Sequence, residues 1–375
     1  CEGMFLRPQH FQQHERATSQ EFKGLHQFGG AYNWGVWKCR VKEHALKDGL
    51  IELDHFEAVL PDMTLVNTLT ASDSVVPLFI DKDVENTLVK ITLPLSNVKG
   101  KNVSDVSEAI VSRYVLKDVD VIDNLTGQDE ETIQVAALNL ELKASNDKLA
   151  GYVELPILKI KEVTAEGEVI LDDSYVPPLI NLLSDKVMSA YLRNVIAMTK
   201  MRADVIAQRL IKGKAASASA VDFIMLQMLN RYEAMLKHFS DLDRLHPLEL
   251  ATILKGYIGE LATFSDKTKR MPSLLAYDHL DVSSVYSELN QVLSQYLSVV
   301  LDQTASKLPL EPRQYGIQVT PLPDKRLLES CQFVLAVKAD TTTDEIRRLV
   351  PAQLKFGPAE QIRDLINNQI NGINV

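Results

Sequence analysis

Apolar residues follow two different spacings along this chain, and the change comes at the Pro177-Pro178 pair. Before it, over residues 21–178, they occur in short runs that alternate with polar residues. A period of two is typical of strands with one buried and one solvated face, so Lys90 and Thr92 of the run 89–95 are expected in water. Turn residues separate the runs, which favours a β-sandwich-like domain of many short strands.

After this pair the apolar period becomes about 3.6, which is typical of helices. The pattern predicts four of them, over about residues 180–212, 220–240, 247–261 and 282–301. The second is apolar nearly all round and must therefore be covered on every side. We expect an antiparallel helical bundle over residues 179–305. Sequence alone leaves two arrangements open: a bundle closed within one chain, and a bundle that also joins copies of the chain.

The last part of the chain, residues 306–375, mixes both patterns. Residues 332–337 read as a buried strand, and residues 343–349 and 359–369 read as short helices. We expect a small α+β unit here, so the whole chain is predicted to be a multidomain α+β protein.

The first residues have a different character, because they combine amides, an arginine and a histidine with several large apolar side chains. Gly3 permits a close backbone approach, and Pro8 pushes Arg7 toward extended geometry. We expect residues 1–20 to form an extended arm that needs a surface to lie on. Its chemistry suits adhesion to a protein partner.

Composition and net charge argue against several classes of function. The formal charge of -10 gives no attraction to phosphate backbones or anionic headgroups, so nucleic acid and direct membrane binding are not expected. No run of about 18 apolar residues exists to insert into a bilayer. The three cysteines, Cys1, Cys39 and Cys331, are odd in number and far apart, which fits a reducing cytoplasm better than a disulfide framework.

Candidate catalytic patterns are weak. His10 and His14 have the i, i+4 spacing of zinc ligands on a helix, but the glutamate of a His-Glu-x-x-His motif is missing between them. Contact residues are the favoured interpretation of this pair. His238, His246 and His279 are expected to be capping or core-edge residues. We therefore expect no enzyme activity, no catalytic residue, no metal site and no cofactor.

Several short motifs are spread along the whole chain, and the first of them lies in the arm. They are, in order, Glu-Gly-Met-Phe-Leu-Arg-Pro-Gln-His-Phe-Gln-Gln at 2–13, Tyr-Asn-Trp-Gly at 32–35, Val-Leu-Pro-Asp-Met-Thr at 59–64, Ile-Leu-Asp-Asp-Ser-Tyr-Val-Pro-Pro at 170–178, and Lys-Phe-Gly-Pro at 355–358 with residues 362–373. Together they resemble the TssK family, the baseplate subunits of bacterial type VI secretion systems. Met63 departs from this pattern, because glycine is usual there.

The resemblance implies a division of labour. Residues 21–178 would be a shoulder domain, residues 179–305 a neck that trimerises, and residues 306–375 the first part of a head domain. The arm and shoulder would bind the wedge made of TssF and TssG. The head would reach TssL and TssM, so that a cytoplasmic homotrimer is held peripherally at the inner membrane.

The resemblance also directs attention to particular residues. For the wedge contact in the arm we predict Phe5, Leu6, Arg7, Pro8, His10 and Phe11. For the trimer contact in the neck we predict Val187, Tyr191, Val195, Leu229, Tyr232, Leu289, Leu293, Tyr296 and Leu297. The family continues past Val375 and no methionine precedes Cys1, so we expect the chain to be a fragment.

Two other functions remain as alternatives. The shoulder-and-neck plan is shared with receptor-binding or tail-fibre-like proteins of contractile phage-like particles, which would bind a cell surface through the third domain. The second alternative is a metal-dependent enzyme that would use the pair His10 and His14 as metal ligands.

Overall fold

The computed structural model describes residues 5–69, 74–97, 99–105, 111–212, 220–298, 308–322 and 354–367, with single positions at 333, 335, 345 and 350. The chain divides into two compact units. The first comprises Cys1–Ile206 with Ile224–Val300, and the second comprises Ala207–Phe223 with Leu301–Val375.

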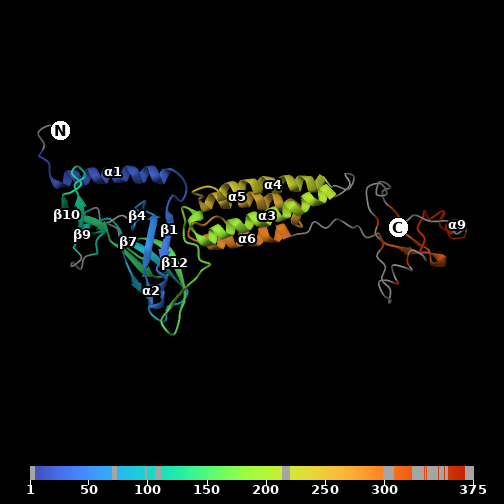
Figure 1. The fold of residues 1–375 in the computed structure, drawn as a ribbon, viewed down its shortest axis with the longest axis horizontal. Helices are drawn as coiled ribbons and strands as arrows, with labels where there is room; N and C mark the ends of the chain where they lie inside the picture. Colours follow the sequence, from blue (N-terminus) through green and yellow to red (C-terminus); the bar gives the residue numbers. More distant parts are fainter. Residues whose placement is uncertain are drawn as a thin grey trace. The chain divides into compact units, whose positions relative to one another are not determined.

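The chain begins with a helix where an extended arm was predicted. Helix α1 spans Pro8–Phe28 (Figure 1). Arg7 is indeed extended, with φ -119° and ψ 155°, but it serves as the N-cap, and Pro8 is the first helical residue. Proline is favoured there because its missing N–H has no partner to lose and its φ already suits a helix. The predicted extended geometry is therefore wrong, and the predicted division at residue 20 falls inside α1.

Several sheets follow α1. Their strands and one short helix are β1 (Gly35–Val41), α2 (Glu43–Lys47), β2 (Leu50–Ile51), β3 (Leu53–Val59), β4 (Leu65–Asn67), β5 (Val75–Val76), β6 (Leu78–Phe79), β7 (Thr87–Pro94), β8 (Val103–Ser104), β9 (Tyr114–Ile122), β10 (Glu130–Leu138), β11 (Leu140–Ala144), β12 (Tyr152–Val163) and β13 (Val169–Leu171). The strand orders are β13-β12-β7-β11-β5, β1-β3-β4, β10-β9-β8 and β2-β6. Many short strands were predicted, and they are confirmed.

Strand β7 lies in the middle of the five-stranded sheet and is buried on both faces. The predicted solvated face is therefore wrong. Lys90 is buried because its ammonium donates to Glu154 at 3.0 Å and to the Asp147 carbonyl at 2.8 Å. Thr92 is buried because its hydroxyl donates to the Glu141 carbonyl at 3.0 Å. The alternation of apolar and polar residues does not distinguish a polar side chain that is buried with hydrogen-bond partners from one that is in solvent.

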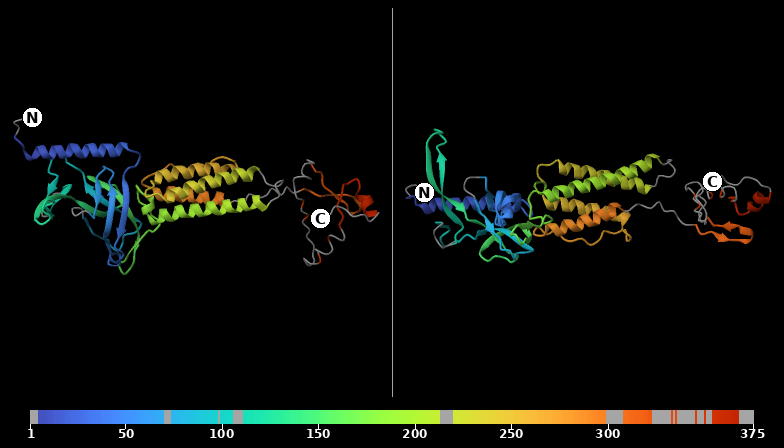
Figure 2. Two further views of the ribbon diagram at one scale, coloured as in Figure 1. Left: turned by 45° about the horizontal axis from the view of Figure 1, so that its top comes forward. Right: turned by 60° about the horizontal axis from the view of Figure 1, so that its bottom comes forward.

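The helical region matches its prediction closely. After the 3-10 turn η1 (Leu182–Ser184) come α3 (Lys186–Lys212), α4 (Ala220–Ser240), α5 (Pro247–Ser265) and α6 (Val282–Ser298), which lie side by side in Figures 1 and 2. The first helix starts later than predicted because Asp185 caps it, with its carboxylate accepting from the Met188 N–H at 2.9 Å.

The bundle is not antiparallel throughout. Tyr286, near the start of α6, donates to the carbonyl of Pro247 at the start of α5 at 2.5 Å. Tyr296, near the end of α6, donates to Asp266 just beyond the end of α5 at 2.8 Å. Helices α5 and α6 therefore run in the same direction, and residues 266–281 return along them. The predicted antiparallel arrangement is wrong for this pair.

Sheets and bundle meet at two of the motifs found in the sequence. Val36 forms a parallel bridge with Leu179, and its N–H donates to the Pro178 carbonyl at 2.7 Å. Gly35 has φ +136°, and a Cβ there would lie 2.7 Å from the same carbonyl oxygen. Only glycine permits this approach. The Trp-Gly and Pro-Pro motifs therefore join the two regions.

The second unit contains β14 (Glu311–Pro312), η2 (Gln314–Gly316), β15 (Gln318–Val319) and α9 (Ile362–Asn367). Helix α9 falls within the predicted helix at 359–369. The predicted strand at 332–337 and helix at 343–349 lie almost wholly outside the described residues. Among the helices that the structure describes, none is long and apolar enough to cross a membrane.

Candidate partner-binding surfaces

Helix α1 carries large apolar side chains that the described part of the chain leaves exposed. Phe11, Phe22 and Leu25 are 63%, 68% and 74% exposed, and none of the residues Pro8–Phe28 is buried. At about 100° per residue the three fall within an arc of about 60° on one face of the helix. We call Phe11, Phe22 and Leu25 the α1 stripe. Phe28, at the end of the helix, is 88% exposed as well.

The opposite side of α1 is tied to the sheets. Lys23 donates to Thr64 Oγ1 at 3.0 Å and pairs with Asp62 at 3.4 Å. Arg113, whose side chain is only 4% exposed, holds the same Asp62 at 2.7 Å and Thr64 at 2.6 Å. Lys23 lies about 100° round the helix from Phe22 and about 160° from Leu25. The tether therefore leaves the α1 stripe turned away from its attachment.

The Asp62 carboxylate is the centre of this tether. Burial alone would raise its pKa, but Arg113, Thr64 and Lys23 outweigh burial and lower the pKa below its usual value. Asp62 also accepts from the Thr64 N–H at 3.1 Å, across Met63 with φ +64°. Methionine thus adopts the left-handed conformation for which the family motif has glycine.

The residues predicted for the wedge contact lie in different local structures. Phe5 and Leu6 precede α1 and are 90% and 67% exposed, while Phe11 belongs to the α1 stripe. Pro8 begins the helix, and His10 Nδ1 accepts from the backbone N–H of Arg7 at 3.0 Å, which caps it. Phe22, Leu25 and Phe28 were not among the predicted contact residues. Their spacing would have found them had a helix been expected.

Most of the predicted trimer contacts are buried within one chain. The buried ones are Val195, Leu229, Tyr232, Leu289, Leu293, Tyr296 and Leu297. Of the other two, Tyr191 is half-buried and packs edge-on against Tyr286, and Val187 is 38% exposed. The buried residues hold this chain's own bundle together and present no free surface to another copy. The prediction that they contact a second copy is therefore corrected.

A different stripe on the bundle is exposed. On α3, residues at steps of three and four remain in solvent, and they are Val187, Ala190, Asn194, Ala197 and Met201. Such spacing is the seam of a coiled coil. We call these residues the α3 seam. Helix α4, predicted to need cover on every side, leaves Phe223 and Ile224 each 56% exposed.

The loop between α1 and β1 is held against the bundle by two imidazoles. His246 Nδ1 accepts from the Leu248 N–H at 3.0 Å and caps α5, so Nε2 carries the proton and donates to the Tyr32 carbonyl at 3.0 Å. His279 donates from Nε2 to the Trp34 carbonyl at 2.8 Å and accepts at Nδ1 from the Tyr277 hydroxyl at 2.8 Å. Both contacts confirm the predicted capping or core-edge roles.

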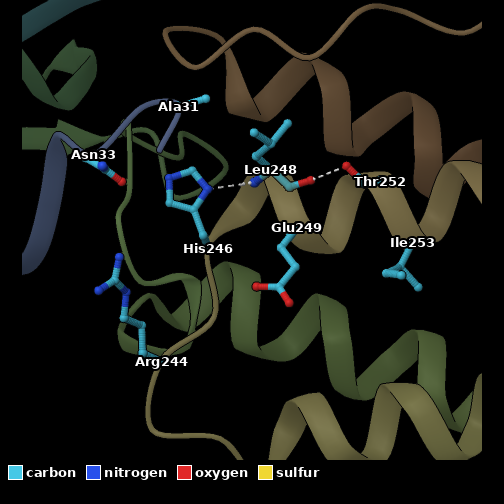
Figure 3. A pocket seen from close by; sticks show the side chains of 8 residues that line it. All are labelled: Ala31, Asn33, Arg244, His246, Leu248, Glu249, Thr252 and Ile253. Carbon is cyan, nitrogen blue, oxygen red and sulfur yellow. Dashed lines mark hydrogen bonds between the residues drawn. The ribbon is translucent and has the colours of Figure 1, made fainter. Parts of the chain in front are cut away.

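The cap formed by His246 requires a neutral imidazole, because its Nδ1 accepts from a backbone N–H. Burial lowers the pKa of His279 to about 4 and lowers the pKa of His246 below its usual value. Beside His246 is a cavity of about 400 Å³, lined by Ala31, Asn33, Arg244, His246, Leu248, Glu249, Thr252 and Ile253 (Figure 3). Its histidine is engaged in capping, so the arrangement is suited to holding the loop in place.

The zinc-type spacing of His10 and His14 gains no further ligand. Among the described residues, no group of three or more His, Cys, Asp or Glu side chains could hold a metal ion.

Comparison with known proteins agrees with this geometry. A family model described as "Bacterial Type VI secretion, VC_A0110, EvfL, ImpJ, VasE" matches residues 10–375. The chain belongs to this family. It is similar to the type VI secretion system baseplate component TssK1 of Pseudomonas aeruginosa (strain PAO1), with 30% identity over 377 residues that cover 100% of the chain and 85% of the relative.

Solved structures give the same result. A crystal structure of TssK is similar with a TM-score of 0.78 and 30% identity, covering 100% of this chain and 85% of that one. A chain in a cryo-electron microscopy structure of the type VI secretion system TssK-TssF-TssG baseplate subcomplex is similar with a TM-score of 0.70 and 25% identity, covering 80% of this chain and 98% of that one. The resemblance to the TssK family is confirmed, and this is a family of structural baseplate components.

Proposed function

We propose that this chain is a trimeric adaptor of the type VI secretion baseplate. It binds the TssF-TssG wedge through α1 and the sheets, and it reaches TssL and TssM at the inner membrane through its C-terminal unit. Membership of the TssK family supports the proposal, as does the relative found with TssF and TssG in a baseplate subcomplex. The observation that carries it is the uncovered α1 stripe.

A helix of this kind calls for a partner. In proteins most helical stability comes from packing an apolar face and not from intrinsic propensity. Helix α1 has such a face but buries none of its residues. Aromatic residues and arginine are enriched at the centres of interfaces, which suits Phe11, Phe22 and the neighbouring Arg7. Bound wedge would cover the stripe while Lys23 keeps the helix attached.

Trimer contacts are placed on the α3 seam in this proposal. Ala190 and Ala197 are small enough for helices to approach closely, and Asn194 is a polar residue of the kind that fixes register and oligomer state. Closed symmetry is the usual state of soluble oligomers. Three joined copies turn weak individual contacts to TssL and TssM into avid attachment, because one bound copy raises the effective concentration of the next. The protein is accordingly placed in the cytoplasm, at the inner-membrane surface, without entering the bilayer.

Co-purification with TssF and TssG tests the wedge contact. We expect the double variant Phe22→Ala with Leu25→Ala to capture the wedge at least about thirtyfold more weakly, since two interface anchors are removed. The matched control is Gln13→Ala with Gln20→Ala, on the far side of the same helix, which should capture it normally. Undiminished capture by the first variant would remove the α1 stripe from the interface.

A further inference from the structure

Strands β9 and β10 form a long hairpin with few neighbours. They pair at nine consecutive positions, from Glu130 opposite Ile122 to Leu138 opposite Tyr114, with no bulge. Residues 123–129 join them, and Leu125 in this tip is 93% exposed. The hairpin extends from the other sheets of its unit in the right-hand view of Figure 2. Its outer half lies in solvent, because every residue from 121 to 134 is exposed.

One edge of this hairpin is unpaired. Strand β8 pairs only with the base of β9, at Tyr114 and Val115, and β10 is the last strand in the order β10-β9-β8. In the described part of the chain no strand pairs with the outer edge of β10. Natural proteins protect such edges with charged residues, above all lysine, with proline or with bulges. Strand β10 (Glu-Glu-Thr-Ile-Gln-Val-Ala-Ala-Leu) has no lysine, proline or bulge, and its only charged residues are Glu130 and Glu131 at its outer end. A regular edge of this kind is a template for an added strand, and its acidic residues disfavour only partners of like charge.

The two faces of the hairpin differ in chemistry. The register places Val119 opposite Ile133 on one face, and beside them Val121 opposite Glu131. On the other face it places Asp118 opposite Gln134 and Asp120 opposite Thr132, and both pairs are hydrogen-bonded. Glu130 lies on this second face too. The first face is therefore mainly apolar and the second mainly acidic.

Charge decides what can pair with this edge. Residues 114–138 contain six carboxylates, Asp118, Asp120, Asp123, Asp129, Glu130 and Glu131, against the single lysine Lys117. Two such hairpins edge to edge would bring like charges together, which disfavours a second copy of this chain. A basic strand would instead place its long side chains over the acidic face.

We propose that the free edge of β10 accepts an extended segment of a protein partner in which basic and apolar residues alternate. The added strand pairs with the backbone of residues 130–134. Its lysines or arginines lie on the face of Asp118, Asp120 and Glu130, and its apolar residues lie on the face of Val121 and Ile133. This site is separate from the α1 stripe and does not depend on the identity of the wedge.

The test uses the full chain and two synthetic peptides of about nine residues. One alternates valine and lysine, and the other alternates valine and glutamate. Fluorescence anisotropy should show the lysine peptide binding at least about tenfold more tightly, with binding weakened by salt. Equal binding of both peptides, or binding of neither, would overturn the proposal.

Two further measurements locate the site. Hydrogen exchange should show new protection at residues 130–134 in the lysine complex, whereas protection confined to α1 would contradict an edge strand. The triple variant Asp118→Lys, Asp120→Lys, Glu130→Lys should bind the lysine peptide at least about tenfold more weakly. Its control, Asp81→Lys, Asp83→Lys, Glu85→Lys, changes net charge equally at other exposed acids, and an equal loss there would show that net charge alone acts.

Discussion

Helices α1 and α6 have similar lengths and amphipathic sequences, but they differ completely in burial. In α6, seven residues are buried, among them Leu289 and Leu293 at 0% exposure. In α1 none is buried, although Phe22 and Leu25 form an equally clear apolar face. The difference shows that a 3.6-residue period identifies which face of a helix must be covered. It does not identify whether the cover comes from the same chain or from another.

The largest expected effect separates the two helices by stability. We expect Leu293→Ala to lower the free energy of unfolding by about 2–5 kcal/mol, because it opens a cavity in the bundle core. Leu25→Ala should change it by less than about 0.5 kcal/mol, because that side chain is in solvent. Urea unfolding of both variants measures this. Comparable losses would mean that α1 is covered after all.

A second prediction concerns the exposed side of the bundle. Met201→Asp places a charge in the α3 seam and should raise the dissociation constant of the proposed trimer at least about a hundredfold while leaving the bundle folded. Sedimentation equilibrium measures the oligomer, for which the parent should have three times the 42.0 kDa mass of one chain. Lys200→Asp, exposed but off the seam, is the control. A Met201→Asp variant that stays trimeric would place the contact elsewhere.

The junction between α1 and the bundle provides a pH-dependent prediction. The pKa of His279 is about 4 when folded and about 6.5 when unfolded, so the unfolded state takes up the proton first as pH falls. The free energy of unfolding should therefore fall between about pH 6.5 and 4, by up to about 3 kcal/mol, and this contribution should then level off.

Replacement of the imidazole isolates this effect. His279→Gln should remove this part of the slope, while the loss from carboxylates such as Asp62, whose lowered pKa acts at more acidic pH, remains. Calorimetry across this range measures both proteins. An unchanged slope in the variant would assign the pH dependence to other groups.

The smallest effect is expected at the tether of α1. Lys23→Ala removes a partly exposed ion pair and should lower the free energy of unfolding by no more than about 1 kcal/mol. It should nevertheless speed amide exchange in α1 more than in α6. Equal exchange in α1 before and after the substitution would show that Lys23 does not hold the helix.

Local signals in the sequence predicted much of the fold. The bounds of α4 and the starts of α5 and α6 were predicted correctly. The signals that mark these helix ends, the onset of the apolar period and Pro247 at a first helical position, are local in the sequence. The change of period at Pro177-Pro178 marked the boundary between sheets and bundle, but its contact with Gly35 and Val36 was not predicted. Helix α1 was missed because Pro8 suggested an extended chain, although proline is equally at home in a first turn.

The predictions that were wrong concern features that depend on contacts between residues distant in sequence. Burial of Lys90 requires Glu154 on another strand, and the parallel direction of α5 and α6 requires the return of residues 266–281. The trimer residues were misplaced because a buried leucine such as Leu293 has the same pattern whether it faces its own chain or a copy. The α1 stripe was visible only in part, through Phe11.

Hydrogen exchange of α1, with and without the TssF-TssG wedge, tests the central claim most directly. In the free protein we expect amides of residues 8–28 to exchange fast and those of residues 282–298 to exchange slowly, because only the second helix is packed. Bound wedge should slow exchange in residues 8–28. Slow exchange there in the free protein, or no change when the wedge binds, would contradict the account.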